Sequence, residues 1–220
     1  VLSLIERFDL NDMLGIGIFC HSLAFTSKIN LRKCFRMAQS NGLIMAMHLS
    51  EGVNELPEIS KIFQLPPPRN HIVGVHCIEG KGYREKGIKV VHCPMTNLIL
   101  YGKTLKNLDE VDALGTDWPL LLGGIDEQVK LAFKLHSNYF KVLEKATIGG
   151  YKVFRMPFEG DYIFYDKPLH SLFKSMDLKP KYVFVKGHIV VEEGKYQGLS
   201  YNEIRKIISF KIKEFIERYS

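Results

Sequence analysis

The chain has 220 residues, of which 46% are hydrophobic and 25% are charged. These fractions are ordinary for a globular protein and exclude a disordered, collagen-like or coiled-coil chain. The net charge of +6 comes from basic residues interleaved with acidic ones, so we expect no nucleic-acid partner. The apolar stretches are too short to span a bilayer, and we expect no membrane partner.

The four cysteines contain no Cys-x-x-Cys pair and no spacing typical of a small disulfide-bonded domain. Free thiols in a reducing compartment are the simplest interpretation, which favours a cytoplasmic protein. A composition rich in Lys and Ile, with one Trp, is typical of a thermophile.

Short apolar runs alternate with helical patterns through residues 1–148. Ser27 is placed to cap a helix that ends before Asn41-Gly42, and further helical patterns cover Asn54–Phe63 and Ile125–Leu143. Strands alternating with helices predict right-handed crossovers and a parallel α/β sheet or barrel. The expected strands are Leu14–Phe19, Leu43–Met47, Ile72–Val75, Lys89–Val91 and Val111–Leu114.

The pattern changes near Gly149. Residues 149–198 read as a small β segment whose last two strands form a hairpin around Lys186-Gly187. Residues 199–220 form a third part, in which an amphipathic helix over Tyr201–Tyr219 carries an apolar stripe. Such a stripe suits packing on its own domain better than a partner or a membrane surface. The expected strands of the β segment are Tyr162–Tyr165, Tyr182–Lys186 and His188–Val191.

Chemically active side chains follow the expected strands, at the end where α/β barrels and sheets place active sites. They are His21, His48, His76, His92 and Asp117. A single histidine there is usually structural, but several in succession favour metal binding or acid–base chemistry. Glu51, three residues after His48, suits a proton shuttle; a carboxylate at a helix start is the alternative.

These motifs together resemble the amidohydrolase superfamily. The resemblance is closest to its cytosine deaminase, S-adenosylhomocysteine deaminase and chlorohydrolase branch, and it covers residues 13–197. It rests on His48-Leu-Ser-Glu51, Val75-His76-Cys77, His92-Cys93-Pro94-Met95-Thr96-Asn97, Gly115-Thr116-Asp117, Ala146-Thr147-Ile148-Gly149-Gly150 and the Val183–Val191 hairpin.

The resemblance implies a fold and roles for individual residues. The fold would be the C-terminal portion, about strands 4–8, of a TIM-like (β/α)8 metal-dependent hydrolase barrel, followed by the small β segment and the terminal helix. His48 and Asp117 would bind metal, and Asp117 would also help to deprotonate water. Glu51 would be the general acid/base, and His76 would orient the attacking water or stabilise developing charge. His92 and Asn97 match a signature that we interpret as mainly structural.

Two residues are candidates for substrate binding. His21 matches a stretch that contacts substrate in the family, although a hydrogen bond that anchors its loop is an equal alternative. Trp118 could stack on a planar heterocycle or pack at the barrel rim.

The metal implied is a single divalent ion, because Cys20-His21 stands where binuclear members carry a carboxylated lysine. Zinc is favoured, with iron or manganese as alternatives. None of the eight histidines forms the His-x-His pair that supplies two further ligands in the family, and the sequence leaves open whether such a pair precedes this chain.

The expected function is hydrolytic deamination of an aminated nitrogen heterocycle, such as a nucleobase or nucleoside. The alternative is a catalytically incomplete relative that serves binding or oligomerisation. The expected partners are a small heterocyclic substrate and either further copies of the chain or the missing N-terminal part.

Overall fold

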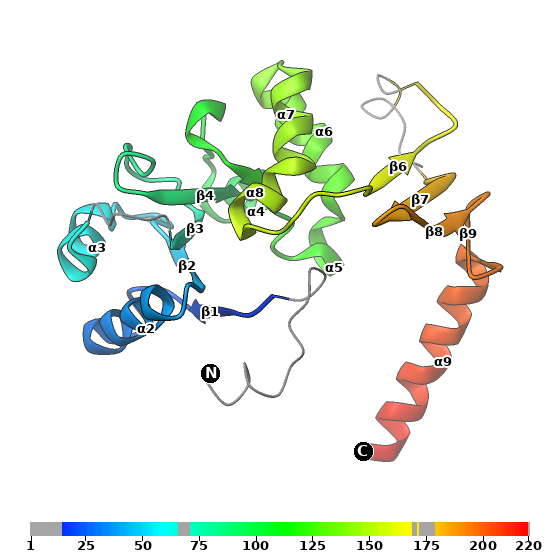
Figure 1. Ribbon diagram of the computed structural model, residues 1–220, viewed down its shortest axis with the longest axis horizontal. Helices are drawn as coiled ribbons and strands as arrows, with labels where there is room; N and C mark the ends of the chain where they lie inside the picture. Colours follow the sequence, from blue (N-terminus) through cyan, green and yellow to red (C-terminus); the bar gives the residue numbers. More distant parts are fainter. Residues whose placement is uncertain (1–14, 66–70, 169–170, 172–178, 220) are drawn as a thin grey trace. The chain divides into compact units, whose positions relative to one another are not determined.

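The computed structural model describes residues 15–65, 71–168, 171 and 179–219 (Figure 1). The chain divides into two compact units, residues 1–157 and 158–220. Leu14, with which the first expected strand begins, lies outside the described residues.

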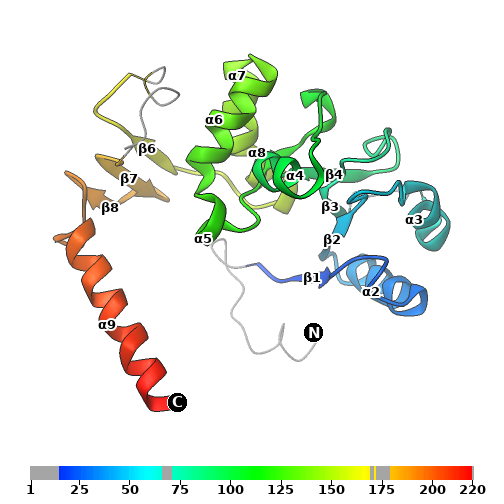
Figure 2. The ribbon, with the colours of Figure 1, turned by 180° about the vertical axis from the view of Figure 1, so that it is seen from behind.

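The first unit is built on a five-stranded parallel sheet in the order β1-β2-β3-β4-β5, visible from both sides in Figures 1 and 2. The order follows the sequence, so each strand lies beside the next one along the chain. The predicted α/β class is therefore confirmed, with strand ends shifted by a few residues. The strands are Gly17–Cys20 (β1), Ile44–Leu49 (β2), Ile72–His76 (β3), Ile88–His92 (β4) and Ala113–Leu114 (β5).

Helices α2 (Lys28–Ser40) and α3 (Leu56–Phe63) join the first three strands. As predicted, Ser27 caps α2, its side chain accepting a hydrogen bond from the Asn30 amide. Alternate residues of β2 are buried, and these pack in the main core with both helices. That core includes Leu31, Phe35, Met45, Met47, Leu49, Ile59 and Ile72.

The opposite set of β2 side chains, Ile44, Ala46 and His48, is only half-buried. Ile44 and Ala46 pack against a smaller apolar cluster formed by Val73, Ala113 and Val153. His48 thus extends from this second set at the carboxyl end of the strand. Because successive side chains of a strand point to opposite faces, His48 lies on the same face of β2 as Ile44 and Ala46.

The remaining helices of this unit are α4 (Pro94–Tyr101), α5 (Pro119–Leu122), α6 (Ile125–His136), α7 (Tyr139–Ala146) and α8 (Ile148–Phe154), with a 3-10 turn at Leu108–Glu110. The prediction of one helix over Ile125–Leu143 is wrong. Ser137 adopts a left-handed conformation that ends α6, and the Asn138 side chain accepts from the Lys141 amide to begin α7. The two caps therefore separate α6 from α7, although the apolar pattern of the sequence continues from one helix into the other.

The second unit contains an antiparallel sheet in the order β10-β9-β8-β7-β6. The predicted hairpin around Lys186-Gly187 is confirmed, because Val185 pairs with His188 and both turn residues have positive φ. The chain described here ends in helix α9 (Tyr201–Tyr219), as predicted. The strands are Tyr162–Phe164 (β6), Tyr182–Val185 (β7), His188–Glu192 (β8), Lys195–Tyr196 (β9) and Leu199–Ser200 (β10).

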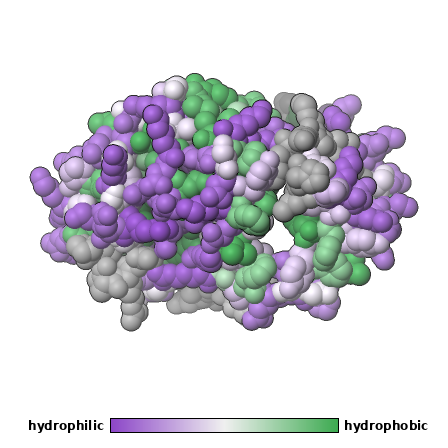
Figure 3. Space-filling model, turned by 90° about the horizontal axis from the view of Figure 1, so that it is seen from above, coloured by the Kyte–Doolittle hydropathy of each residue, from purple (hydrophilic) through white to green (hydrophobic). Residues whose placement is uncertain are grey.

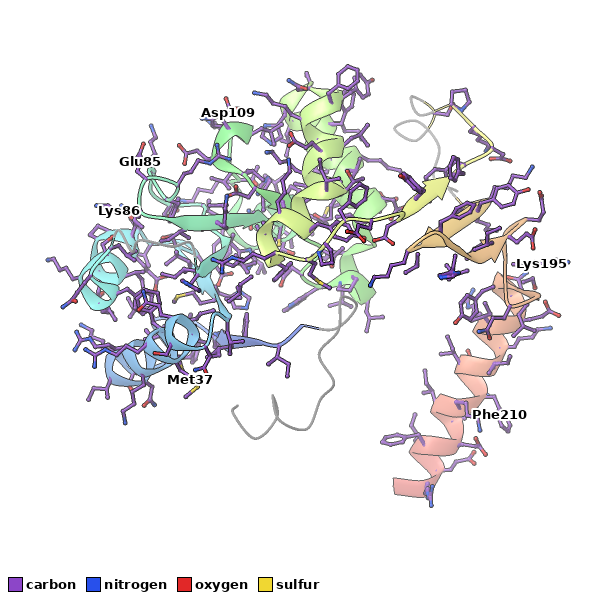
Figure 4. All side chains as sticks on the ribbon, viewed as in Figure 1. Met37, Glu85, Lys86, Asp109, Lys195 and Phe210 are labelled. Atoms are coloured by element: carbon purple, nitrogen blue, oxygen red, sulfur yellow. The ribbon has the colours of Figure 1, made fainter. Side chains whose placement is uncertain are left out.

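Hydrophilic side chains dominate the face drawn in Figure 3, with hydrophobic patches among them. Figure 4 shows Glu85 and Lys86 at the tip of the β3–β4 connection, and Phe210 projecting from α9, where it is 61% exposed. Among the described residues, no helix has the length and apolar character needed to cross a membrane.

Candidate active site

The site lies at the carboxyl end of the parallel sheet. His48 and Leu49 end β2, and their partners Val75 and His76 end β3. Because parallel strands finish at the same edge, residues far apart in the sequence meet there.

His48, Glu51 and His76 form the centre of the site. The His48 Nδ1 and His76 Nε2 atoms are 3.0 Å apart. The Glu51 carboxylate lies 3.3 Å from His76 Nε2 and 3.6 Å from His48 Nδ1. One ligand atom from each side chain lies within 4.8 Å of the other two, so the group could hold a metal ion.

The backbone is unusual where the strands end. Ser50, His76 and Asp117 have φ values of 54°, 74° and 57°. Non-glycine residues rarely adopt this left-handed region, and such conformations gather at functional sites. Here they turn successive strand ends into loops that keep their side chains at the sheet edge.

Glu51 is held by contacts on both sides. The Ser50 amide donates to Glu55 Oε2 at 2.8 Å, and the Glu55 amide donates to Ser50 Oγ at 3.2 Å. This reciprocal pair fixes the loop to the start of α3. From α4, the Tyr101 hydroxyl donates to Glu51 Oε1 at 3.0 Å.

Tyr101 was not found by sequence reasoning. Burial, with the hydrogen bond to Glu51 as the next cause, raises the pKa of Tyr101 to about 12. The hydroxyl therefore keeps its proton at neutral pH and acts as a donor to the carboxylate.

His76 is fully buried and is fixed from behind by Asn97 on α4. Asn97 Oδ1 lies 2.8 Å from His76 Nδ1, while Asn97 Nδ2 lies 3.3 Å from His92 Nδ1. Thr104 Oγ1 completes the group, 3.4 Å from both Asn97 Nδ2 and His92 Nε2.

Burial favours the neutral forms of His48 and His92. Burial lowers the pKa of His48, although the nearby Glu51 opposes this effect. Burial lowers the pKa of His92 to about 3, assisted by His136 and His76. A neutral imidazole is the form that binds a metal or accepts a proton.

His21 lies beside the centre of the site. Its ring centroid is 5.0 Å from that of His48, and Phe25 packs edge-on against it at 4.9 Å. The His48 amide donates to the His21 carbonyl at 2.9 Å, and the His21 ring contacts Ser22 Oγ at 3.3 Å. His21 is therefore near His48 and exposed, and its role in substrate binding stays a prediction.

Asp117 and Trp118 follow β5 at the same edge of the sheet. Asp117 lies outside the group of three ligand atoms, but its negative charge partly opposes the lowering of the His48 pKa by burial and adds to the burial that raises the pKa of Cys93. The Trp118 side chain is 52% exposed. Their predicted roles in metal and substrate binding stay predictions.

The chain was compared with known proteins. No protein-family model matches it. It is 26% identical to the 5-methylthioadenosine/S-adenosylhomocysteine deaminase 1 of Archaeoglobus fulgidus over 264 aligned residues, which cover 97% of this chain and 61% of that protein.

Solved structures give the fold. An adenosine deaminase from Xanthomonas campestris with bound zinc matches with a TM-score of 0.75 at 15% identity, over 98% of this chain and 60% of that one. An atrazine chlorohydrolase from Arthrobacter aurescens TC1, complexed with zinc and atraton, matches with a TM-score of 0.78 at 13% identity, over 96% and 58%. An amidohydrolase from a Sargasso Sea sample matches with a TM-score of 0.68 at 17% identity, over 99% and 60%.

The resemblance to the amidohydrolase superfamily is confirmed. The chain spans about three fifths of the length of the proteins that it matches. Its parallel sheet is part of an amidohydrolase-type barrel, as predicted.

The side chains at this sheet edge fit a divalent metal. His48, Glu51 and His76 lie together there, Asp117 follows β5 at the same edge, and imidazole and carboxylate donors suit zinc, iron or manganese. The 3.0 Å separation of His48 Nδ1 and His76 Nε2 is that of a hydrogen bond, so the two nitrogens share a proton.

Proposed function

We propose that this chain carries part of the active site of a metal-dependent hydrolase that deaminates an aminated nitrogen heterocycle of nucleobase or nucleoside type. The convergence of His48, Glu51 and His76 at one sheet edge is the observation that carries the proposal. The similarity to a deaminase of 5-methylthioadenosine and S-adenosylhomocysteine supports the substrate class.

A single divalent ion, zinc in the first instance, would be held by His48 and Asp117, beside the Glu51 and His76 side chains. When bound, such an ion lowers the pKa of water from 15.7 to roughly 7 and so supplies a nucleophile at neutral pH. The similar solved structures of the adenosine deaminase and the atrazine chlorohydrolase contain zinc, which supports zinc as the metal.

Glu51 has the position of the general acid/base. Its Oε1 atom accepts a hydrogen bond from Tyr101, while Oε2 lies 3.6 Å from His48 Nδ1. The second oxygen can therefore take a proton from the attacking water and return it to the leaving amine. General acid–base catalysis of this kind contributes roughly 10²–10⁴ in rate.

His76 would orient the attacking water, and the aromatic pair of His21 and Phe25 would contact the planar substrate beside His48. Trp118 would stack on the heterocycle from the β5 end. These roles fit a site in which a few polar groups orient a largely apolar ligand.

The test uses the complete protein that contains this chain, loaded with zinc, and a panel of adenosine, 5-methylthioadenosine, S-adenosylhomocysteine and cytosine. Ammonia release is the readout. Glu51→Gln should lower turnover by roughly 10²–10⁴ while the protein keeps its metal. Glu58→Gln, which changes a carboxylate paired with Lys28 on the surface of α3, should have no effect.

Unchanged turnover in Glu51→Gln would contradict the acid/base role. Loss of metal together with turnover would show that Glu51 is a ligand instead. Ammonia release from none of the substrates by the unchanged protein would favour the alternative of a non-catalytic binding or oligomerisation domain.

A further inference from the structure

We propose that Asn97 is a positioning residue that holds His76 in the tautomer with its proton on Nδ1, leaving Nε2 bare toward His48 and Glu51. This inference rests on the proposed function for its consequence in catalysis, but the tautomer itself follows from contacts within the chain.

The first step is the contact between Asn97 and His76. Asn97 Oδ1 lies 2.8 Å from His76 Nδ1, and both side chains are fully buried. A carbonyl oxygen can only accept, so Nδ1 carries the hydrogen. A neutral imidazole has one N–H, and its other nitrogen then has a free lone pair.

The second step explains why the amide of Asn97 has this orientation. Its Nδ2 end faces His92 Nδ1 at 3.3 Å and Thr104 Oγ1 at 3.4 Å. His92 is deeply buried and neutral, so one of its nitrogens is bare and can accept from the amide. The other nitrogen of His92 lies 3.4 Å from Thr104 Oγ1 and can donate to that oxygen.

The third step is the opposite side of the His76 ring. His48 Nδ1 is 3.0 Å from His76 Nε2 and donates to it if Nε2 is bare. Glu51 Oε1 lies 3.3 Å from the same Nε2 but takes its hydrogen bond from Tyr101. The contacts of His76 with Asn97 and His48 thus agree with the Nδ1–H tautomer.

The consequence concerns what His76 does in the reaction. With Nε2 bare, the neutral ring accepts a hydrogen bond from water and so orients its lone pairs; it does not donate to the substrate. Partners of this kind, behind a functional histidine, typically change activity or metal affinity by roughly 10–100-fold when they are removed.

The test is a long-range ¹H–¹⁵N spectrum of the full chain with ¹⁵N-labelled histidine, recorded without metal near neutral pH. The His76→Gln variant assigns the His76 signals by their loss. We expect a protonated Nδ1 and an unprotonated Nε2 in the unchanged chain. A proton on Nε2 would overturn the proposal.

Two variants complete the test. Asn97→Leu removes the acceptor at similar volume, and the His76 signals should shift toward those of the Nε2–H form. Thr104→Val removes the contacts of Thr104 Oγ1 with Asn97 Nδ2 and His92 Nε2 but leaves the Asn97 Oδ1 contact with His76, so the tautomer of His76 should persist. An Asn97→Leu spectrum identical to that of the unchanged chain would overturn the role of Asn97.

Circular dichroism shows whether Asn97→Leu folds, and if it does not, the unchanged chain and Thr104→Val still decide the tautomer. Because the spectrum does not depend on turnover, the inference and the proposed function fail separately. An Nδ1–H tautomer in a protein that releases no ammonia would support the role of Asn97 and contradict the proposed deaminase function.

Discussion

The Tyr101 hydroxyl donates a hydrogen bond to Glu51 Oε1 across 3.0 Å, joining helix α4 to the loop after β2. The Tyr101 ring also lies close to Gly52, where an added Cβ would meet ring carbons at 3.5 and 3.6 Å. Tyr101 therefore fixes both the carboxylate and the turn that carries it.

Tyr101→Phe should lower kcat of the complete protein by about fivefold with little change in KM, because the loss of one hydrogen bond of about 1 kcal/mol releases Glu51 from its position. The ring and its packing remain, so the melting temperature should change little. Steady-state kinetics and a thermal melt check both. Tyr196→Phe, in the second unit, is the control, and an equal loss in both variants would contradict a specific role for Tyr101.

Adjacent glycines in α8 should respond to alanine in opposite ways. A Cβ on Gly149 would lie 2.5 Å from the Asp112 carbonyl oxygen and 3.2 Å from Ala113 Cα, whereas a Cβ on Gly150 meets nothing within 4 Å. Gly149→Ala should cost about 1–3 kcal/mol in the free energy of unfolding. Gly150→Ala should stabilise the chain by up to about 1 kcal/mol, because alanine favours the helix.

Urea unfolding of the two variants tests this pair of predictions. Equal effects would show that β5 and α8 do not pack as closely as the structure describes.

Stability should fall as the pH is lowered from neutral toward 5. Burial lowers the pKa of His92 to about 3, from an ordinary value of 6.5. Between these values the unfolded chain binds a proton that the folded chain does not, so the free energy of unfolding decreases as pH falls. The limiting slope for one such group is about 1.4 kcal/mol per pH unit.

The free energy of unfolding, measured in urea at several pH values, checks the slope. His92→Gln should flatten the pH dependence, whereas His188→Gln, at an exposed position of β8, should leave it unchanged. If the free energy of unfolding of His92→Gln still depends steeply on pH, groups other than His92 cause the dependence.

The buried thiols should be unreactive in the folded chain. Burial raises the pKa of Cys20 and of Cys93 to about 12, and it also raises that of Cys77. The thiolate is the reactive form, so these three should modify slowly with a disulfide reagent at a pH of about 8. The half-buried Cys34 should react first, and all four should react in denaturant.

Peptide mapping after brief labelling identifies the modified residue. Rapid labelling of Cys77 or Cys93 in the folded chain would contradict the packing at the ends of β3 and β4.

Sequence reasoning predicted the sheet and its chemically active edge because both follow from local patterns. Apolar runs separated by helices specify parallel strands, and residues just after such strands meet at one edge. The positions of His48, Glu51 and His76 after two successive expected strands are enough to place them at one edge of the sheet.

Contacts that arrive from other elements could not be predicted in this way. Tyr101 reaches Glu51 from 50 positions away, on a helix that begins at Pro94 within a continuous apolar stretch. The break at Ser137 was also missed, because the apolar pattern continues from α6 into α7 while the backbone does not. Left-handed caps and side-chain contacts across elements depend on tertiary packing, which periodicity does not encode.

The central claim is that the strand ends of this chain assemble a metal-binding, water-activating site. Its most direct test is calorimetric titration of Zn²⁺ into the purified chain, with His48→Gln and the surface variant His188→Gln alongside. We predict one equivalent of zinc for the unchanged chain and for His188→Gln, and binding weakened by roughly 10-fold or more in His48→Gln. Zinc binding that is absent, or that is equal in all three proteins, would contradict the account.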